Sequence, residues 1–195
     1  MNRFCSACGF ALVENARFCI RCGTPVSADR FAYTGPAGED AGSVITAESL
    51  FNITKQELSD LFSYNRLGRE FTGDISIIRD RVRRTVRGTP SETLDGIAES
   101  HMAGVRQRLS QIDDGVNDRN WDNVADFLKN GLPAAIVSYF YNPLLASEVK
   151  SIMDLLKELS KKGWDKTSFL GKAAVPSAKF EDVYTLRYIT SNIRF

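Results

Sequence analysis

Two cysteine pairs near the N-terminus constrain this chain more than any other feature of the sequence. Cys5 and Cys8 form one Cys-x-x-Cys turn, Cys19 and Cys22 form a second, and ten residues separate the two turns. The sequence contains no further cysteine. Two such turns can direct four sulfurs at one ion, in the tetrahedral geometry of a structural zinc site. The spacing therefore predicts one structural Zn²⁺ bound by these four cysteines.

The segment around the cysteines is too small to fold by burying apolar surface. Its two halves echo each other, because Phe4 and Gly9 flank the first pair as Phe18 and Gly23 flank the second. A glycine after each pair suits a backbone that needs a positive φ where it wraps sulfur. About 25 residues bury too little surface to be stable, whereas structural zinc contributes roughly 10–16 kcal/mol in comparable peptides. We therefore expect the metal to organise residues 1–26 into two β knuckles.

This pattern resembles the zinc-ribbon family found at the N-termini of many bacterial and archaeal proteins. The resemblance covers about residues 3–26, with Ser6 and Ile20 at positions where the common pattern often has proline. The residues that carry it are Phe4, Cys5, Cys8, Gly9, Ala16, Arg17, Phe18, Cys19, Cys22 and Gly23. The resemblance implies a zinc-binding ribbon. Such ribbons bind a protein or nucleic-acid partner more often than they catalyse a reaction.

Two disulfides or a rubredoxin-like iron site are the alternatives that the cysteines leave open. Disulfides need an oxidising compartment, and the N-terminus has no secretory apolar run. We therefore favour zinc in a cytoplasmic protein. Four thiolates leave no open coordination position, so we expect the ion to be structural and not catalytic.

The rest of the chain has the size of one ordinary globular domain. The whole sequence is 43% apolar and 25% charged, and its net charge of +1 gives no general attraction to nucleic acid or an anionic membrane. The longest uncharged stretch, residues 130–147, is broken by Pro133 and Pro143 and is too short to span a membrane. We expect a ribbon over residues 1–26, a flexible linker over 27–46 and a mainly α-helical domain over 47–195.

Helix signals recur through residues 47–195. Residues 54–57 (Thr-Lys-Gln-Glu) predict a capping box at the start of one helix, and Asp74 can cap the next. Thr89 and Pro90 predict the start of a helix of about 35 Å that ends near Ile112 and forms the spine of the core.

The second half of this domain contains further helix signals. Residues 121–128 begin an amphipathic helix that the Gly-Leu-Pro sequence at 131–133 interrupts or ends. Pro143 opens a last long helix that Gly163 ends. Residues 180–195 are ambiguous, because their aromatic and β-branched residues favour a strand by propensity but also fit one face of a helix. We favour a strand or extended segment there.

Arginine is concentrated between residues 66 and 87. Seven arginines stand against three acids in this stretch, which gives 7 − 3 = +4. Because guanidinium groups match phosphate oxygens, the stretch predicts a phosphate- or RNA-binding face. Its candidate contacts are Arg79, Arg83, Arg84 and Arg87. The alternative, which we favour, is a solvated helix face paired with the acids at positions 113, 114, 118, 122 and 126.

The remaining polar residues predict no catalytic centre. His101 is the sole histidine and lies one helical turn from Ile97 and Val105, so we expect a partnered core or boundary residue. Three aspartates at 118, 122 and 126 could share a helix face, but no glutamate or histidine joins them in a magnesium site. The hydrolase, dinucleotide and Walker motifs are missing from the sequence. We therefore expect a protein that is not an enzyme.

These patterns together predict an interaction protein. We expect a zinc-binding adaptor whose ribbon and helical domain dock on macromolecular partners, with a protein as the principal partner. The sequence leaves the partner's identity and the oligomeric state open. The alternative is a nucleic-acid-binding regulator that uses the arginine-rich helix 75–87 together with the zinc ribbon.

Overall fold

The computed structural model of the protein describes residues 3–4, 11–12, 45–67, 75–113, 117–167 and 177–194. The chain divides into two compact units, Met1–Ser43 and Val44–Phe195, and each is described by itself. The four cysteines, residues 27–44 of the predicted linker and the predicted cap Asp74 lie outside the described residues.

A short hairpin is described in the first unit. β1 (Arg3–Phe4) pairs with β2 (Ala11–Leu12) in antiparallel register, with Arg3 opposite Leu12 and Phe4 opposite Ala11. Directly opposed residues of an antiparallel pair lie about 4.5–5.5 Å apart at their Cα atoms. Phe4 and Ala11, which flank the first cysteine pair in the sequence, are therefore close to each other.

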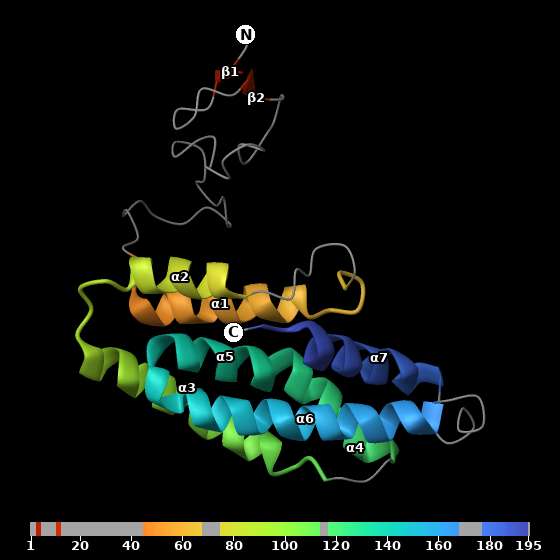
Figure 1. The fold of residues 1–195 in the computed structure, drawn as a ribbon. Helices are drawn as coiled ribbons and strands as arrows, with labels where there is room; N and C mark the ends of the chain where they lie inside the picture. The colour runs from red at the N-terminus through yellow and green to blue at the C-terminus, as the bar shows by residue number, and fades with distance from the viewer. Residues whose placement is uncertain are drawn as a thin grey trace, which may run out of the picture. The chain divides into compact units, whose positions relative to one another are not determined.

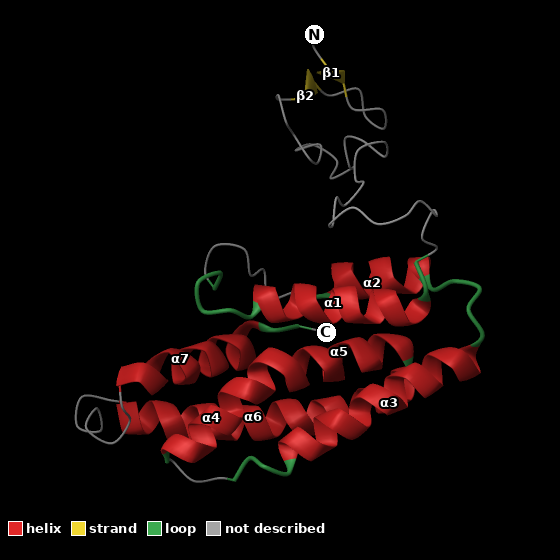
Figure 2. Cartoon of the chain, turned by 180° about the vertical axis from the view of Figure 1, so that it is seen from behind, coloured by secondary structure: helices red, strands yellow, loops and turns green. Residues whose placement is uncertain are grey.

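The second unit is helical, as predicted, and its described residues include no β-strand (Figures 1 and 2). None of the helices described is long and apolar enough to cross a membrane. In chain order the elements are α1 (Ala47–Leu61), α2 (Ser76–Thr85), α3 (Ser91–Leu109), α4 (Asp118–Asp126), the π-helical turn η1 (Phe127–Gly131), α5 (Leu132–Tyr141), the 3₁₀ turn η2 (Pro143–Leu145), α6 (Ala146–Thr167) and α7 (Ser177–Asn192).

The helix at the centre of this unit is α5. Every residue of α5 except Tyr139 is buried, and α1, α2, α3 and α6 all pack against it (Figure 1). A helix that is apolar on all sides can be satisfied only in the interior. The expectation that the helix near residues 89–112 is the spine is therefore wrong. That helix, α3, buries only one face, through Ala98, Met102 and Val105.

Pro133 distorts the helix that leads into α5 but does not end it. The backbone stays in the right-handed helical region at Asp126, Phe127, Gly131 and Leu132, so α4, η1 and α5 follow one another continuously. Proline has no N–H, and its ring clashes with the carbonyl four residues earlier. Just before it, the N–H of Leu132 donates to the carbonyl of Phe127, five residues back, which is the hydrogen bond of a π turn.

Two predicted helix starts are displaced. The first helix begins at Ala47 and not at Thr54, because the hydroxyl of Thr46 accepts the Ser49 N–H at 3.1 Å and caps it. Thr54 instead lies buried inside α1. For α3, the residue before the first helical position is Pro90, and no side chain caps the helix there.

Gly163 does not end α6, contrary to the sequence-based expectation. The helix continues to Thr167, and Gly163 is buried within it. A Cβ at this position would lie 2.5 Å from the indole ring of Trp121 and 3.2 Å from a methyl group of Val183. The missing side chain therefore lets Trp121 of α4 and Val183 of α7 approach the α6 backbone.

The C-terminal segment is a helix, so the expectation of a strand over residues 180–195 is wrong. In α7, Val183, Leu186 and Ile189 are buried at helical spacing, and α7 packs along α6 (Figure 1). The apolar face against α6 decides the structure over strand propensity, which depends strongly on context. After α7, the carbonyl of Arg194 accepts the Ile75 N–H at 3.2 Å, which joins the chain end to the start of α2.

We predict that Gly163→Ala destabilises the helical unit by about 1–3 kcal/mol, the usual range for overpacking a core. The matched control is Gly96→Ala, because a Cβ at Gly96 of α3 meets no atom within 4 Å. The control should stabilise the protein by about 0.5–1 kcal/mol through helix propensity. Urea unfolding followed by circular dichroism measures both changes. Equal effects of the two substitutions would contradict the role assigned to Gly163.

Candidate zinc site and cationic surface

The chemistry of the four cysteines fits zinc. Two Cys-x-x-Cys pairs supply four thiolates, which is the complete donor set of a structural site. The described hairpin brackets the first pair, since β1 ends one residue before Cys5 and β2 begins three residues after Cys8. That Cys5, Cys8, Cys19 and Cys22 ligate one ion remains a prediction, because all four lie outside the described residues.

The arginines predicted to bind phosphate lie on α2 and the turn that follows it. Arg83, Arg84 and Arg87 are exposed. Within the described residues, Arg83 and Arg87 have no carboxylate partner, and the Nε of Arg84 donates to the backbone carbonyl of Asp80 at 3.2 Å. We call Arg83, Arg84 and Arg87 the arginine face. Its three guanidinium groups are available to an anion.

Arg79, the fourth predicted phosphate contact, and Arg81 are engaged with other side chains. Arg79 is half-buried, and its Nε lies 3.3 Å from Asp80. Burial lowers the pKa of Arg79, but hydrogen bonds to Asp80 and Tyr139 outweigh that effect and raise the pKa above its ordinary value. Arg81 forms a bidentate pair with Glu57 of α1, with one contact at 3.1 Å. Arg79 and Arg81 therefore fix α2 to its neighbours.

The acids of α4 do not neutralise the arginine face, contrary to the pairing that we favoured from sequence. Asp122 pairs with Lys179 of α7. Asp126 lies 3.1 Å from the Nε of Arg108 and also accepts a hydrogen bond from Asn130. The partners of these acids come from α3, α7 and the adjoining turn η1, and no local pattern of residues indicates that choice.

The spacing of the three aspartates of α4 is also compatible with a magnesium site. Asp118, Asp122 and Asp126 are exposed on α4. Two of them already pair with the basic side chains named above. Among the residues that the structure describes, no cluster of three or more histidine, cysteine, aspartate or glutamate side chains could hold a metal ion. The described part of the helical unit therefore offers no metal centre.

His101 is a partnered boundary residue, as predicted. Its ring stacks on Phe51 with centroids 3.8 Å apart, and its Nε2 lies 2.9 Å from Glu48 Oε1. Tyr141 packs edge-on against the same Phe51 and donates its hydroxyl to the Ala47 carbonyl at 2.7 Å. Burial, together with Glu48, raises the pKa of Tyr141 to about 12. These contacts fix the start of α1 against α3 and α5.

Sequence reasoning missed one perturbed carboxyl, Asp182 on α7. It lines an open pocket of about 320 Å³ formed by residues of α1, the turn that follows α1, α4, η1 and α7. Burial raises the pKa of Asp182 above its ordinary value, Lys179 opposes this effect, and Glu181 adds to it. No signal in the sequence marked this residue, because its environment depends on the packing of a segment that we expected to be extended.

We predict that Asp182→Asn raises the midpoint of thermal unfolding at pH 7. The Asp182 carboxyl binds its proton more tightly in the folded state than in the unfolded chain. The wild-type protein therefore loses stability as the pH rises through the pKa that Asp182 has in the folded state. The advantage of the variant should shrink as the pH falls toward about 4, the ordinary pKa of aspartate. Circular dichroism melts at several pH values measure it. Glu158→Gln, on the exposed side of α6, is the charge-matched control, and an equal gain there would contradict the prediction.

Comparison with known proteins identifies the N-terminal part alone. No curated protein and no solved structure matches the chain. One family model matches, that of a zinc-ribbon domain, over residues 4–26. This range contains all four cysteines and both described strands apart from Arg3. Residues 4–26 are therefore a zinc-ribbon domain, and this family implies zinc binding.

Proposed function

We propose that this protein is a zinc-binding interaction protein without enzymatic activity. Its ribbon, organised by one structural Zn²⁺ on Cys5, Cys8, Cys19 and Cys22, docks on one macromolecule. Its helical unit contacts a second partner, which is a protein. The observation that carries the proposal is the joining of a zinc-ribbon domain to a larger unit with a separate apolar core.

The metal chemistry supports binding over catalysis. Four thiolates fill the tetrahedral coordination of zinc and leave no position for water or substrate. A reducing compartment, which we propose is the cytoplasm, keeps the four thiols available to the metal.

The ionisable groups of the helical unit support the same proposal. Among its described residues, the buried polar side chains are hydroxyls and amides: Thr54, Asn120, Ser138, Asn142, Ser160 and Thr185. Catalytic acids and bases are typically held in clefts whose burial and neighbouring charges shift their pKa values. Asp182 is a carboxyl of this kind, because it lines a pocket and burial raises its pKa, but no histidine or cysteine among the described residues lines that pocket. The single histidine forms a boundary contact with Glu48, and several other carboxylates pair with cations at the surface.

A second candidate function is nucleic-acid binding through the arginine face. The specific observation in its favour is that Asp122 and Asp126 contact Lys179 and Arg108 and leave Arg83, Arg84 and Arg87 exposed. Guanidinium groups bind phosphate oxygens in a fork geometry. Against this candidate, a net charge of +1 supplies little long-range attraction to a polyanion.

We predict that Cys5→Ser and Cys19→Ser each abolish stoichiometric zinc binding and leave the helical unit folded. Elemental analysis of reduced protein measures the metal. Limited proteolysis, with and without a chelator, should show cleavage within residues 1–43 and a protected helical fragment. Zinc retained by both variants would contradict the ligand assignment. Loss of helical signal on chelation would contradict the separation of the two units.

The nucleic-acid candidate has its own test, which uses a labelled 20-nucleotide single strand and the full-length protein. If the arginine face binds phosphate, Arg83→Ala with Arg84→Ala should reduce the magnitude of the slope of log affinity against log salt by about 1.4, because each lost contact to a single strand accounts for about 0.7. The control replaces Arg119 and Lys129, two exposed cations elsewhere, with alanine. Equal losses in the two double variants, or no salt-dependent binding by wild type, would exclude the arginine face as a nucleic-acid site.

A further inference from the structure

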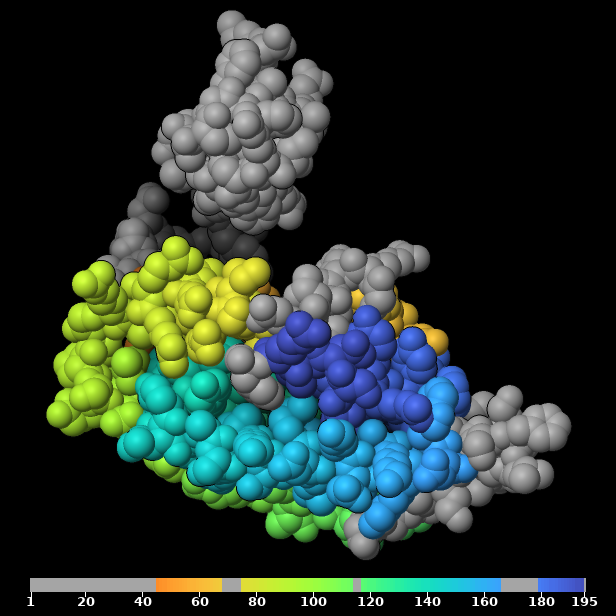
Figure 3. Space-filling model, in the orientation of Figure 1, coloured from red at the N-terminus to blue at the C-terminus, as the bar shows by residue number. Residues whose placement is uncertain are grey.

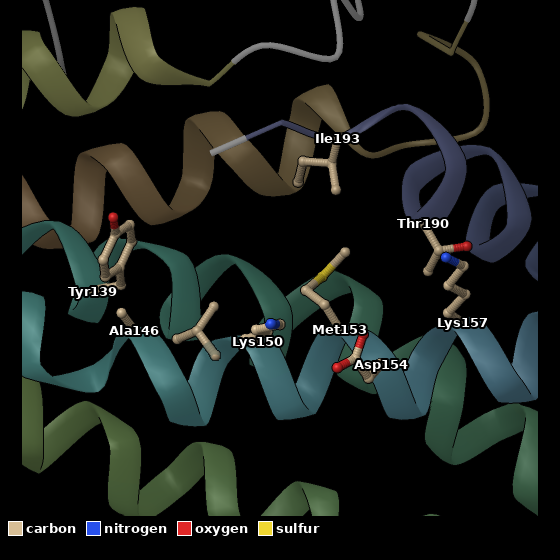
Figure 4. A pocket seen from close by; sticks show the side chains of 9 residues that line it. Tyr139, Ala146, Lys150, Met153, Asp154, Lys157, Thr190 and Ile193 are labelled. Carbon is tan, nitrogen blue, oxygen red and sulfur yellow. The ribbon is translucent and has the colours of Figure 1, made fainter.

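A groove of about 360 Å³ opens on the helical unit between α5, α6 and the end of α7 (Figure 4). Figure 3 draws the helical unit from the side on which α2, α6 and α7 are visible. Met153 rises from α6 toward the groove, and Ile193 enters from the opposite side (Figure 4). The full lining is Tyr139, Ala146, Val149, Lys150, Met153, Asp154, Lys157, Thr190 and Ile193.

The floor of this groove is apolar and continuous with the core. Val149 is buried, while Tyr139, Met153 and Ile193 are partly buried and pack against the core cluster. The volume lies at the low end of the range of about 300–1,000 Å³ for ligand pockets. The groove is also open to solvent and not enclosed. Such a shape suits side chains presented by another chain better than a small molecule that needs to be enclosed.

Two lysines lie at the rim of the groove. Lys150 and Lys157 are exposed on α6, and neither has a carboxylate partner among the described residues. They are seven residues apart, which is about 10.5 Å along a helix axis. Asp154 is the one acid in the lining, so the lining charge is 2 − 1 = +1. An anionic occupant is therefore favoured, with its charges at the two ends of the groove.

The lining favours a peptide over a nucleic acid. Proteins that bind single strands stack bases on several exposed aromatic rings. This groove has one ring, that of Tyr139, and the Tyr139 side chain is hydrogen-bonded to Arg79. Its other apolar groups are aliphatic or thioether side chains, which suit leucine-like anchors. A helix laid in a groove presents such anchors at i, i+3 or i+4 and i+7.

We propose that this groove docks a short amphipathic helix of a partner protein that carries two acidic residues about two turns apart. Its apolar side chains enter between Met153 and Ile193, and its carboxylates pair with Lys150 and Lys157. The inference deepens the proposed function, on which it rests, by assigning the protein-binding surface of the helical unit and the chemistry of its partner.

The test begins with a phage-displayed library of random 16-residue peptides, selected on the full-length, zinc-loaded protein. Selected sequences should be enriched in acidic residues that flank apolar ones. Synthetic copies are then measured by fluorescence anisotropy against Lys150→Glu with Lys157→Glu. Reversing two rim charges should weaken binding by about tenfold. Lys129→Glu with Lys161→Glu, which changes net charge equally at exposed positions outside the groove, should leave affinity unchanged.

A second readout locates the bound peptide. The chain has three methionines, so methyl-¹³C labelling gives three signals. The Met153 signal should shift during titration, while that of Met102, buried in α3, should stay in place. This internal control reports that the fold is intact in every variant.

The outcomes separate the groove from the wider proposal. Peptides without acidic enrichment, peptides insensitive to the charge reversal, an unmoved Met153 signal or no selected peptide would each overturn the groove assignment. Peptides that bind wild type but not the Cys5→Ser variant would place binding on the ribbon, so the proposed function would stand without the groove. Loss of oligonucleotide binding in the Lys150→Glu, Lys157→Glu variant would make the groove a nucleic-acid surface and overturn the inference.

Discussion

The burial of α5 is the constraint on which the helical unit depends. A ten-residue segment, Leu132–Tyr141, is apolar on all sides and is stable only when other helices cover all of them. α1, α2, α3 and α6 supply that cover. Its one partly exposed residue, Tyr139, lies in the groove between α5 and α6. The groove is thus the place where the cover of the central helix is incomplete.

The close packing around α5 extends to the second helical layer. α6 and α7 pack along each other, and Gly163 allows the indole of Trp121 to approach the α6 backbone. Because protein interiors are packed as densely as organic crystals, a change in one side chain shifts the helices that pack around it. One missing side chain in α6 therefore affects the positions of both α4 and α7.

The two units depend on different physical interactions. The helical unit has a large apolar core made of residues from all of its helices. The ribbon segment is too short for such a core, and the family to which residues 4–26 belong uses zinc in its place. We infer that metal removal and core substitutions act on separate parts of the chain.

The sequence determined the elements whose signals are local. Four cysteines at fixed spacing identified the ribbon, and apolar periodicity between residues 54 and 163 indicated that the second unit is mainly helical. His101 could be assigned to the core boundary from its place beside Ile97 and Val105. Ligand spacing and helical period depend on neighbours a few residues away, so they can be read along the chain.

Only the tertiary structure decided which residues meet across the fold. It made α5 the centre, kept Gly163 inside α6 and turned the C-terminal segment into a helix against α6. It also paired Asp122 with Lys179 and Asp126 with Arg108, two of the five acids that we expected to pair with the arginine-rich stretch. Charge pairs and close approaches join residues tens of positions apart, and a linear pattern of residue types contains no distance between such positions.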